Sequence, residues 1–501
     1  MNQKKAGVII SYCSEALKIL SSLLYTPLVL RLLGQSEYGL YQLVYSVVGY
    51  LGLLSLGFTG AYSRYYFKTR KEGTEENVAN LNGMFMTVFL AIALVAALCG
   101  TIMVLNVRAV FATGLAEEEL KSAKILMAIM VFNLCVTFPD SVFNCIISTH
   151  EQFIFQRLLS LLRGVFGPFL TIPALLMGYG SVGMVLVSTV LTLTQIAINA
   201  WFVFVKLHTR FSFGHFDWPI FRDISRFTFF IFLNQIIDQI NWSVDRFLLG
   251  RMVGTVAVAV YAVGANLNAL YLHYSAIISS VFSPQINRLV AERNDNHELS
   301  ELFTRIGRIQ FIMLSLVLSG FVFFGKRFVE LWAGQNYSEA FYVGLWLIVP
   351  ATIPLLQTLG LTIQTAKNKH QARSIVYALI SIGNVLISIP LIRRYGVVGA
   401  SIGTAIALTL GETLFMNWYY AKRIGLEIGA FWREILRIFP ALVVPVAAGL
   451  VIHSRVTITG YASLALWIAV YTAIFAVFMW RFGMNASEKK LLTDLTARFR
   501  R

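Results

Sequence analysis

The chain has 501 residues, of which 57% are apolar and 13% are charged, and its mean hydropathy is +0.69. This is more apolar surface than the core of a soluble domain can hide, so the composition predicts an integral membrane protein. The formal charge of +16 does not indicate nucleic-acid binding, because Lys and Arg lie in short segments beside apolar runs, where membrane orientation places them.

Apolar runs of about 20 residues, the length that crosses a bilayer, recur along the whole chain. Charged or Gly/Pro-rich breaks divide them into fourteen predicted helices, at 7–33, 38–62, 83–106, 123–147, 157–178, 181–206, 224–250, 253–286, 306–331, 340–366, 373–393, 396–421, 435–453 and 457–481. We therefore expect an all-α membrane protein of about fourteen transmembrane helices. The connections are about 20 residues or shorter and leave no room for a soluble catalytic domain, so we do not expect an enzyme.

The distribution of basic residues predicts the orientation of the chain. With the N-terminus inside, the inner segments hold 28 of the 41 Lys and Arg residues and the outer segments hold 10. Segments that stay in the cytoplasm are enriched in Lys and Arg. The expected location is therefore a plasma (inner) membrane, crossed many times, with both termini in the cytoplasm.

The chain repeats itself at a shift of about 220 residues. The first match pairs Arg31 with Arg251, Gly34 with Gly254, and Tyr41 with Tyr261. The second pairs Tyr179-Gly180-x-Val182-Gly183 with Tyr395-Gly396-x-Val398-Gly399. These matches predict two pseudo-symmetric six-helix lobes, at residues 1–206 and 207–425, in a parallel arrangement that suits rocking-bundle transport. Residues 426–501 then hold two C-terminal helices and a basic tail.

The seventh predicted helix carries polar residues at helical spacing. They are Asn234, Asp238, Asn241 and Asp245, which fall within an arc of about 60°. Because a charge in an apolar helix costs roughly 2.5–3.5 kcal/mol on insertion, such residues usually face a bundle interior or a wet cavity. The stripe therefore indicates a cavity lining, and a structural pair between one of its aspartates and Arg246 stays open as the alternative.

Cationic residues in other helices are candidates for phosphate contact. Lys18 lies with Glu15 in the first helix, Arg64 closes the second, and Arg163 lies inside the fifth. A Glu15–Lys18 pair and arginines that extend to the headgroups are the structural alternatives. Metal ligands are not expected, because the four cysteines lie in apolar segments without CxxC or Cys/His spacing.

Two further carboxylates, Asp140 and Glu412, also fall inside apolar helices. Each could have a proton- or sodium-linked role or belong to a packed polar network. The residue types alone leave both possibilities open.

Segments near the N-terminus resemble a known family. Leu32–Tyr41, Tyr50–Phe58 and the Arg64-Tyr65 pair are similar to bacterial polysaccharide-repeat-unit flippases, the Wzx-like exporters of the multidrug/oligosaccharidyl-lipid/polysaccharide superfamily. The local similarity covers about 40 residues, and the expected topology matches throughout. The resemblance implies two six-helix lobes around a central cavity, alternating access, and an undecaprenyl-pyrophosphate-linked oligosaccharide as substrate.

This resemblance gives the candidate residues expected roles. Lys18, Arg64 or Arg163 would hold the pyrophosphate, and Asn234, Asn241 and the nearby carboxylates would bind sugar hydroxyls or a coupling H+ or Na+. No other cofactor is expected. The partners implied are membrane lipid, a polysaccharide polymerase and glycosyltransferases.

Other functions remain as alternatives. In a proton- or sodium-coupled multidrug or organic-cation antiporter of the same architecture, Asp238 and Asp245 would bind cation and proton in exchange. A membrane glycosyltransferase or polymerase would need a catalytic cluster in a sizeable loop, which the sequence lacks. A scaffold for surface-polymer enzymes would move no substrate.

Overall fold

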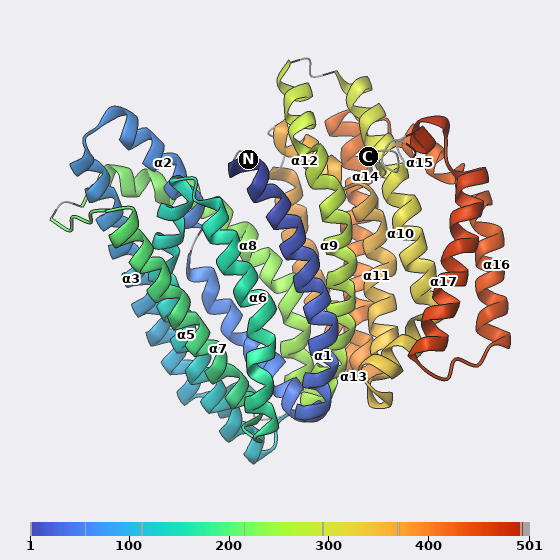
Figure 1. Ribbon diagram of the computed structural model, residues 1–501, viewed down its shortest axis with the longest axis horizontal. Helices are drawn as coiled ribbons and strands as arrows, with labels where there is room; N and C mark the ends of the chain where they lie inside the picture. The colour runs from blue at the N-terminus through green and yellow to red at the C-terminus, as the bar shows by residue number, and fades with distance from the viewer. Residues whose placement is uncertain are drawn as a thin grey trace. The chain divides into compact units, whose positions relative to one another are not determined.

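The computed structural model describes residues 3–55, 57–111, 114–214, 216–292, 295–367, 369, 371–490 and 493. Throughout this described part the regular secondary structure is helical, and no strand occurs in it (Figure 1). The predicted all-α fold is therefore confirmed. The chain forms two compact units, Met1–Ala259 and Val260–Arg501.

The first unit contains seven long or medium helices and a short one. They are α1 (Gln3–Gly49), α2 (Phe58–Glu72), α3 (Glu75–Leu105), α4 (Val107–Phe111), α5 (Glu117–Thr149), α6 (Phe153–Leu176), α7 (Gly180–Trp201) and α8 (Trp218–Met252). A 3-10 turn at Tyr50–Ser55 precedes α2, and a π-helical turn at Phe202–Lys206 ends α7.

Most of α9 belongs to the second unit, because the two units divide at Ala259, near the start of this helix. Its helices are α9 (Thr255–Glu292), α10 (Asn296–Trp332), α11 (Ala340–Leu356), α12 (Thr358–Ala366), α13 (Gln371–Leu408), α14 (Met416–Tyr419), α15 (Ile428–Leu436), α16 (Phe439–Arg455) and α17 (Tyr461–Phe478). A 3-10 turn at Gln335–Tyr337 precedes α11. π-helical turns occur at Thr409–Phe415, Tyr420–Ile424 and Met479–Gly483.

Glycines at matched positions of the predicted repeat have positive φ angles. Gly34 has φ 75° and Gly254 has φ 121°, and Gly180 and Gly396 have φ 55° and 58°. L-residues rarely adopt these angles, so each glycine permits a sharp break between consecutive helices. The shared conformation agrees with a duplication. The lobe boundaries stay a prediction, because the compact units divide at Ala259, inside α9.

Three predicted helices are divided in the structure. The helix expected at 38–62 is interrupted by the 3-10 turn and by Gly57, which has φ 70°. The helix expected at 340–366 breaks at Gln357, three residues after Pro354, because a proline ring removes a helical hydrogen bond. The helix expected at 435–453 bends by 43° between α15 and α16, next to Pro440.

Ten described helical segments are long and apolar enough to cross a membrane, or eleven if the bent α15–α16 pair is one span. Two of the ten, Leu17–Lys71 and Ile375–Ile424, have 55 and 50 residues. At about 1.5 Å per residue, each is more than twice the thickness of a hydrocarbon core of about 30 Å. Gly34 and Gly396 break them, so each is long enough for two crossings, and the total of fourteen stays a prediction.

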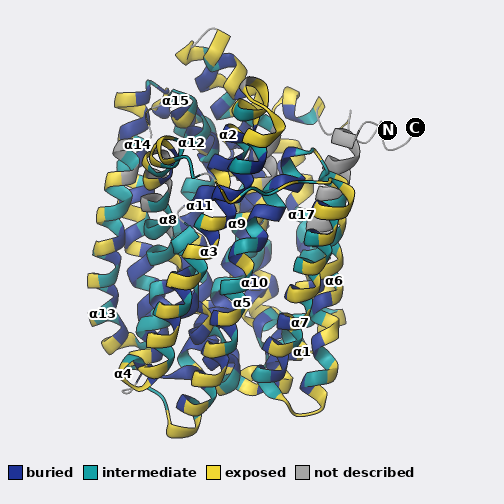
Figure 2. Ribbon diagram, turned by 90° about the vertical axis from the view of Figure 1, so that its left-hand side faces the viewer, coloured by how far each residue is buried: buried dark blue, intermediate teal, exposed yellow. Residues whose placement is uncertain are grey.

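Apolar stripes on the outer helices indicate the surfaces that face lipid. On α3, Leu94, Leu98 and Ile102 are 59–63% exposed at intervals of one turn. On α13, Leu379 and Leu386 are 63% and 65% exposed, and Figure 2 shows exposed residues along this helix. Exposing a leucine to water costs about 1.5–3 kcal/mol. These stripes therefore fit a hydrocarbon environment.

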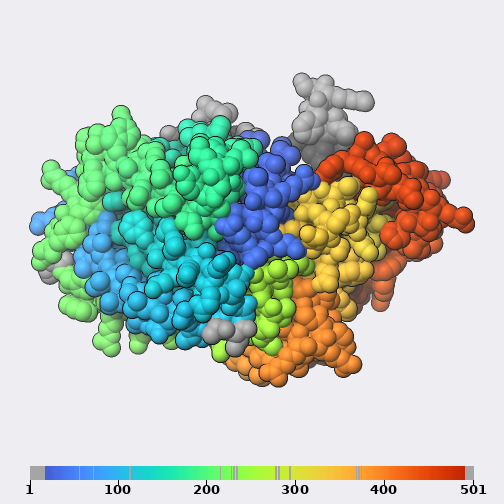
Figure 3. All heavy atoms as spheres, turned by 90° about the horizontal axis from the view of Figure 1, so that it is seen from below, coloured from blue at the N-terminus to red at the C-terminus, as the bar shows by residue number. Residues whose placement is uncertain are grey.

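Each unit has its own aromatic core. In the first, Tyr62 is fully buried, packs edge-on against Phe85 with ring centroids 5.0 Å apart, and donates a 2.6 Å hydrogen bond to Asn82. In the second, Phe303 packs on Phe431 at 4.8 Å. Figure 3 shows α1 in blue against the green end of α6, and α16 and α17 in red against α10 in yellow.

Candidate functional site

The polar face of α1 packs against α6. Lys18 lies over Gly164, where an added Cβ would be 2.9 Å from the lysine stem, and its Nζ donates to Ser160 Oγ at 3.0 Å. Two turns further along, the Tyr25 and Thr171 hydroxyls are 2.5 Å apart. Lys18 and Tyr25 are seven residues apart on α1, and Ser160 and Thr171 are eleven apart on α6, so this face of α1 is directed at α6 over about two turns. The Glu15 side chain lies outside the described residues.

The Arg163 side chain extends from α6 toward α7. Its guanidinium donates to Gln195 Oε1 at 2.7 Å and to Thr192 Oγ1 at 2.8 Å. The residue is exposed, and these two protein oxygens accept from its charged group. Ser160 and Arg163 are i, i+3 neighbours on α6, so the residue that accepts from Lys18 and the residue that reaches α7 lie within one turn of the same helix.

A buried carboxylate lies in the same unit. Asp140 on α5 is 4% exposed and accepts hydrogen bonds from Asn144 at 2.8 Å and from Asn199 on α7 at 2.9 Å. Arg163 acts on it electrostatically. Gln156 on α6 donates to the Asn144 carbonyl at 2.8 Å. Charge and amide groups from α5, α6 and α7 therefore form one network.

The described part of the α8 stripe is turned toward protein. Asp245 is fully buried and acts electrostatically on Tyr50, whereas Trp242 is exposed. Asn241 is partly buried, and its Nδ2 has no hydrogen-bond partner among the described residues. The side chains of Asn234 and Asp238 lie outside the described residues. This helix therefore presents buried polar groups near its C-terminal half.

The structure groups some of the predicted residues and separates others. Lys18 contacts α6 within one turn of Arg163, whereas Arg64 is exposed on α2, where its charge acts on Tyr65. The sequence left the role of Asp140 open between ion coupling and a packed polar network. In the structure it accepts hydrogen bonds from Asn144 and Asn199. The signal in the sequence for Asp140 was a carboxylate beside a proline in an apolar helix. Its partner Asn199, 59 residues further along the chain, gave no signal of its own.

The second unit has its own polar contacts. Arg373 on α13 forms a 2.9 Å ion pair with Glu412, which lies in the π-helical turn Thr409–Phe415. Asn384 donates to Thr404 at 3.3 Å, and both residues are buried. The Glu412 carboxylate therefore has an arginine partner within the packed helices.

Metal ligands do not cluster in the described part of the chain. No group of three or more His, Cys, Asp or Glu side chains gathers there in a way that could hold a metal ion.

Comparison with known proteins gives one family match and two long relatives. The family model described as "Polysaccharide biosynthesis protein" matches residues 5–290. The "Putative O-antigen transporter" of Shigella flexneri is 21% identical over 407 residues, which cover 78% of this chain and 91% of that protein. The "Uncharacterized membrane protein EpsK" of Bacillus subtilis (strain 168) is 21% identical over 495 residues, or 95% and 94% of the two chains.

Solved structures share the fold. The lipid II flippase MurJ in an inward closed conformation superimposes with a TM-score of 0.72 at 14% identity, covering 95% of this chain and 98% of MurJ. An inward-facing multidrug resistance transporter of the MATE family superimposes with a TM-score of 0.65 at 15% identity, covering 84% and 99%. At these identities the likeness shows the fold alone.

Proposed function

Because this chain belongs to the polysaccharide biosynthesis protein family, we propose that it is a flippase for a lipid-linked oligosaccharide. It moves an undecaprenyl-pyrophosphate-linked repeat unit across the bacterial plasma membrane by alternating access. The observation that carries the proposal is that two cations within apolar spans donate to neutral side-chain oxygens: Lys18, which contacts one turn of α6, and Arg163, which belongs to that turn.

These two cations suit a pyrophosphate that must leave water. An arginine has five N–H donors, and Gln195 and Thr192 accept from two of the guanidinium nitrogens of Arg163. Charge-assisted hydrogen bonds to phosphate are about twice as strong as neutral ones, which offsets part of the cost of dehydration. The lysine and the arginine would therefore bind the phosphate end, and Arg64 would meet it at the membrane surface.

The stripe on α8 suits the other parts of the substrate. Amide groups such as those of Asn234 and Asn241 both donate and accept hydrogen bonds, as sugar hydroxyls do. Carboxylates at Asp238 and Asp245 would bind a coupling H+ or Na+, with Glu15 beside Lys18 in the cation's path. The full burial of Asp245 supports this role, because a buried carboxylate is stabilised by a proton or a cation.

The same burial favours a second function. A carboxylate without exposure could exchange an organic cation for a proton, as in a proton- or sodium-coupled multidrug antiporter of this fold. The two functions differ in the charge of the cargo. A flippase carries an anionic lipid, and an antiporter carries a cation.

The location and partners follow from the proposed substrate. The chain would lie in the plasma membrane with both termini in the cytoplasm, where most of its basic segments are expected. Glycosyltransferases would supply the repeat unit on that side, and a polymerase would receive it on the other.

The test is translocation in vesicles that contain the purified protein. A radiolabelled lipid-linked oligosaccharide is placed in the outer leaflet, and its protection from impermeant periodate is followed with time. We expect protection to grow within minutes in vesicles with protein and to remain at background in protein-free vesicles. Absence of protection together with proton-driven efflux of ethidium would replace the flippase with the antiporter.

A further inference from the structure

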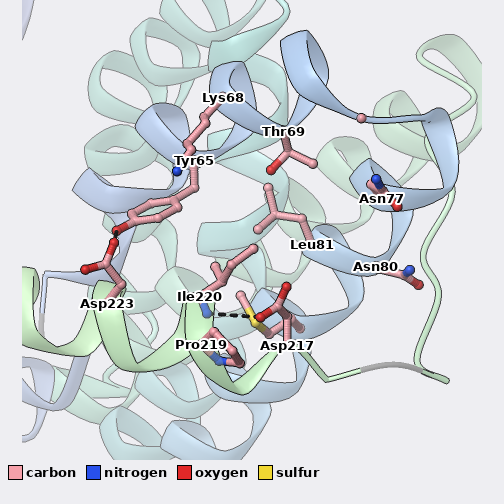
Figure 4. A pocket seen from close by; sticks show the side chains of 12 residues that line it. Tyr65, Lys68, Thr69, Asn77, Asn80, Leu81, Asp217, Pro219, Ile220 and Asp223 are labelled. Atoms are coloured by element: carbon pink, nitrogen blue, oxygen red, sulfur yellow. Dashed lines mark hydrogen bonds between the residues drawn. The ribbon is translucent and has the colours of Figure 1, made fainter.

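A cavity of about 660 Å³ opens in the first unit where the ends of α2, α3 and α8 meet. This is within the range of about 300–1,000 Å³ that small-ligand sites occupy. Figure 4 shows Lys68 and Thr69 on α2, Asn77 and Asn80 on α3, and Asp217 at the start of α8 around it. None of these residues belongs to the site described above.

Hydrogen bonds between elements fix the walls of this cavity. The Tyr65 hydroxyl donates to Asp223 Oδ2 at 2.6 Å and so ties α2 to α8 (Figure 4). The segment before α8 is held on α3, because Ser212 N donates to the Ala79 carbonyl at 3.0 Å. At Gly83 an added Cβ would lie 1.8 Å from the Ser212 carbonyl oxygen, so the two backbones are in direct contact. A ligand therefore meets a preformed wall and loses little affinity to ordering.

The lining groups match a ligand rich in hydroxyls. Thr69, Asn77 and Asn80 offer donors and acceptors together, and Lys68 adds a donor. Within the described chain, no hydrogen bond occupies the side chains of Lys68, Thr69 or Asn80. Leu81 also lines the cavity and supplies an apolar surface for the C–H faces of sugar rings.

The helix ends around the cavity disfavour a phosphate group. A helix N-terminus normally attracts anions. Here α8 is capped by Asp217, whose carboxylate accepts from Ile220 N at 3.0 Å, and α3 begins with Glu75 and Glu76 in its first turn. Carboxylates therefore already occupy or surround both positive helix ends, and a neutral polyol fits better than an anion.

The cavity belongs to the side of the membrane that is expected to be cytoplasmic. Seven of its twelve lining residues come from the segments 64–71 and 206–226, which carry four Lys or Arg residues each, and the other five lie between them at 73–84. Lipid-linked sugars would reach a flippase from that side. We propose that the cavity is a loading site that binds the sugar portion of the substrate before translocation, an inference that rests on the proposed function.

A binding experiment tests the site on the full-length protein in lipid nanodiscs. The probe is the oligosaccharide repeat unit freed from its lipid pyrophosphate by mild acid, and saturation-transfer NMR measures its binding. We expect Thr69→Trp, which places a large ring in the cavity, and N77A/N80A, which removes two amides, to weaken binding by about tenfold or more, the loss expected when two hydrogen bonds are removed.

Matched controls lie on the same helices outside the cavity. Lys71→Trp places the same ring elsewhere on α2, and Asn106→Ala removes an amide at the other end of α3, so both should bind as the wild type does. Equal binding by wild type, T69W and N77A/N80A would overturn the site. Competition by inorganic pyrophosphate would overturn the assignment of a neutral ligand.

The vesicle assay separates this inference from the proposed function. A loading site predicts that N77A/N80A raises the half-saturating concentration of lipid-linked oligosaccharide about tenfold and leaves the maximal rate unchanged. If the wild type transports and N77A/N80A leaves the half-saturating concentration unchanged, the loading site is wrong and the flippase proposal still holds. If the wild type moves no lipid-linked sugar but binds the free glycan through this cavity, the flippase proposal fails and the glycan site stands.

Discussion

At the scale of single residues, Lys18 illustrates how a charge is kept inside an apolar helix. Its stem packs on Gly164, which has no side chain to displace it, and its ammonium group reaches Ser160. The Ser160 hydroxyl is a neutral hydrogen-bond partner for the ammonium group within an apolar span.

Replacing Lys18 by Met keeps the packed stem and removes the charge. If the ammonium group holds phosphate, its loss should cost about 1.5–3 kcal/mol, or about 10- to 150-fold in the half-saturating concentration of lipid-linked oligosaccharide. The vesicle assay measures this change. Lys124→Met, at an exposed position of α5, is the matched control, and equal transport by the two variants would remove Lys18 from the binding site.

Arg308 is a buried charge with two carboxylate partners, Glu434 and Glu488. It is 5% exposed on α10 and contacts Glu488 at 2.7 and 3.2 Å, the Glu434 carbonyl at 2.9 Å and the Gly483 carbonyl at 3.1 Å. Glu488 is equally buried. These contacts fix the segment that follows α17 to α10, so their role is structural.

We expect Arg308→Ala to destabilise the protein by about 3–5 kcal/mol, because it leaves the Glu488 carboxylate buried without its cation. Thermal unfolding in detergent micelles measures the loss. The double variant R308M/E488L should recover most of it. Arg108→Ala breaks an ion pair whose side chains are 72% and 68% exposed, and it should change stability by less than about 1 kcal/mol. A similar loss in both single variants would contradict the structural role.

At the scale of elements, glycines decide where long helical segments turn. Gly34 has φ 75° and ψ 175°, and Gly396 has φ 58° and ψ −132°. An added Cβ at either position would meet nothing within 4 Å. The cost of a side chain there is therefore a backbone cost, separate from any clash.

G34A and G396A should each destabilise the protein by about 1–3 kcal/mol through backbone strain. Gly320→Ala is the matched control, because Gly320 lies inside α10 and an added Cβ there also meets nothing within 4 Å. Alanine is the better helix former, so this control should be neutral or stabilising by up to about 1 kcal/mol. Equal thermal midpoints for all three variants would show that the breaks do not depend on glycine.

The elements predicted from hydropathy agree with the structure where the chain is regular and differ where backbone geometry intervenes. The apolar run at 83–106 became α3 with little change at its C-terminal end. The run at 38–62 became two helices, because Gly57 with φ 70° interrupts it without lowering its hydropathy. A hydropathy window measures composition and does not register a change of φ at one residue.

At the scale of the whole molecule, the number of crossings can be measured directly. If Ile375–Ile424 crosses the membrane twice, Arg394 lies outside and Lys422 lies inside. In a variant without the four native cysteines, Arg394→Cys should react with an impermeant maleimide on intact cells, and Lys422→Cys should react only after permeabilisation. Lys121→Cys and Lys71→Cys are the corresponding controls in the first unit.

Failure of Arg394→Cys to react from outside would contradict the total of fourteen helices and the orientation drawn from the basic residues. Ile375–Ile424 is one apolar helical segment, yet its 50 residues are enough for two crossings. Labelling of the introduced cysteines distinguishes one crossing from two independently of length and hydropathy.

The sequence by itself determined that the chain is a membrane protein, that it is helical, and that glycines recur at matched positions about 220 residues apart. These properties are encoded locally, by hydropathy over about 20 residues and by single glycines. It also placed charges such as Lys18 and Arg163 inside apolar runs.

Only the tertiary structure decided what those charges meet. Lys18 and Ser160 are 142 residues apart, Asp140 and Asn199 are 59 apart, and Tyr65 and Asp223 are 158 apart. The cavity of α2, α3 and α8 likewise joins residues 65–84 to residues 217–223. Such contacts depend on which helix faces pack together, and helical periodicity specifies a face without specifying its neighbour.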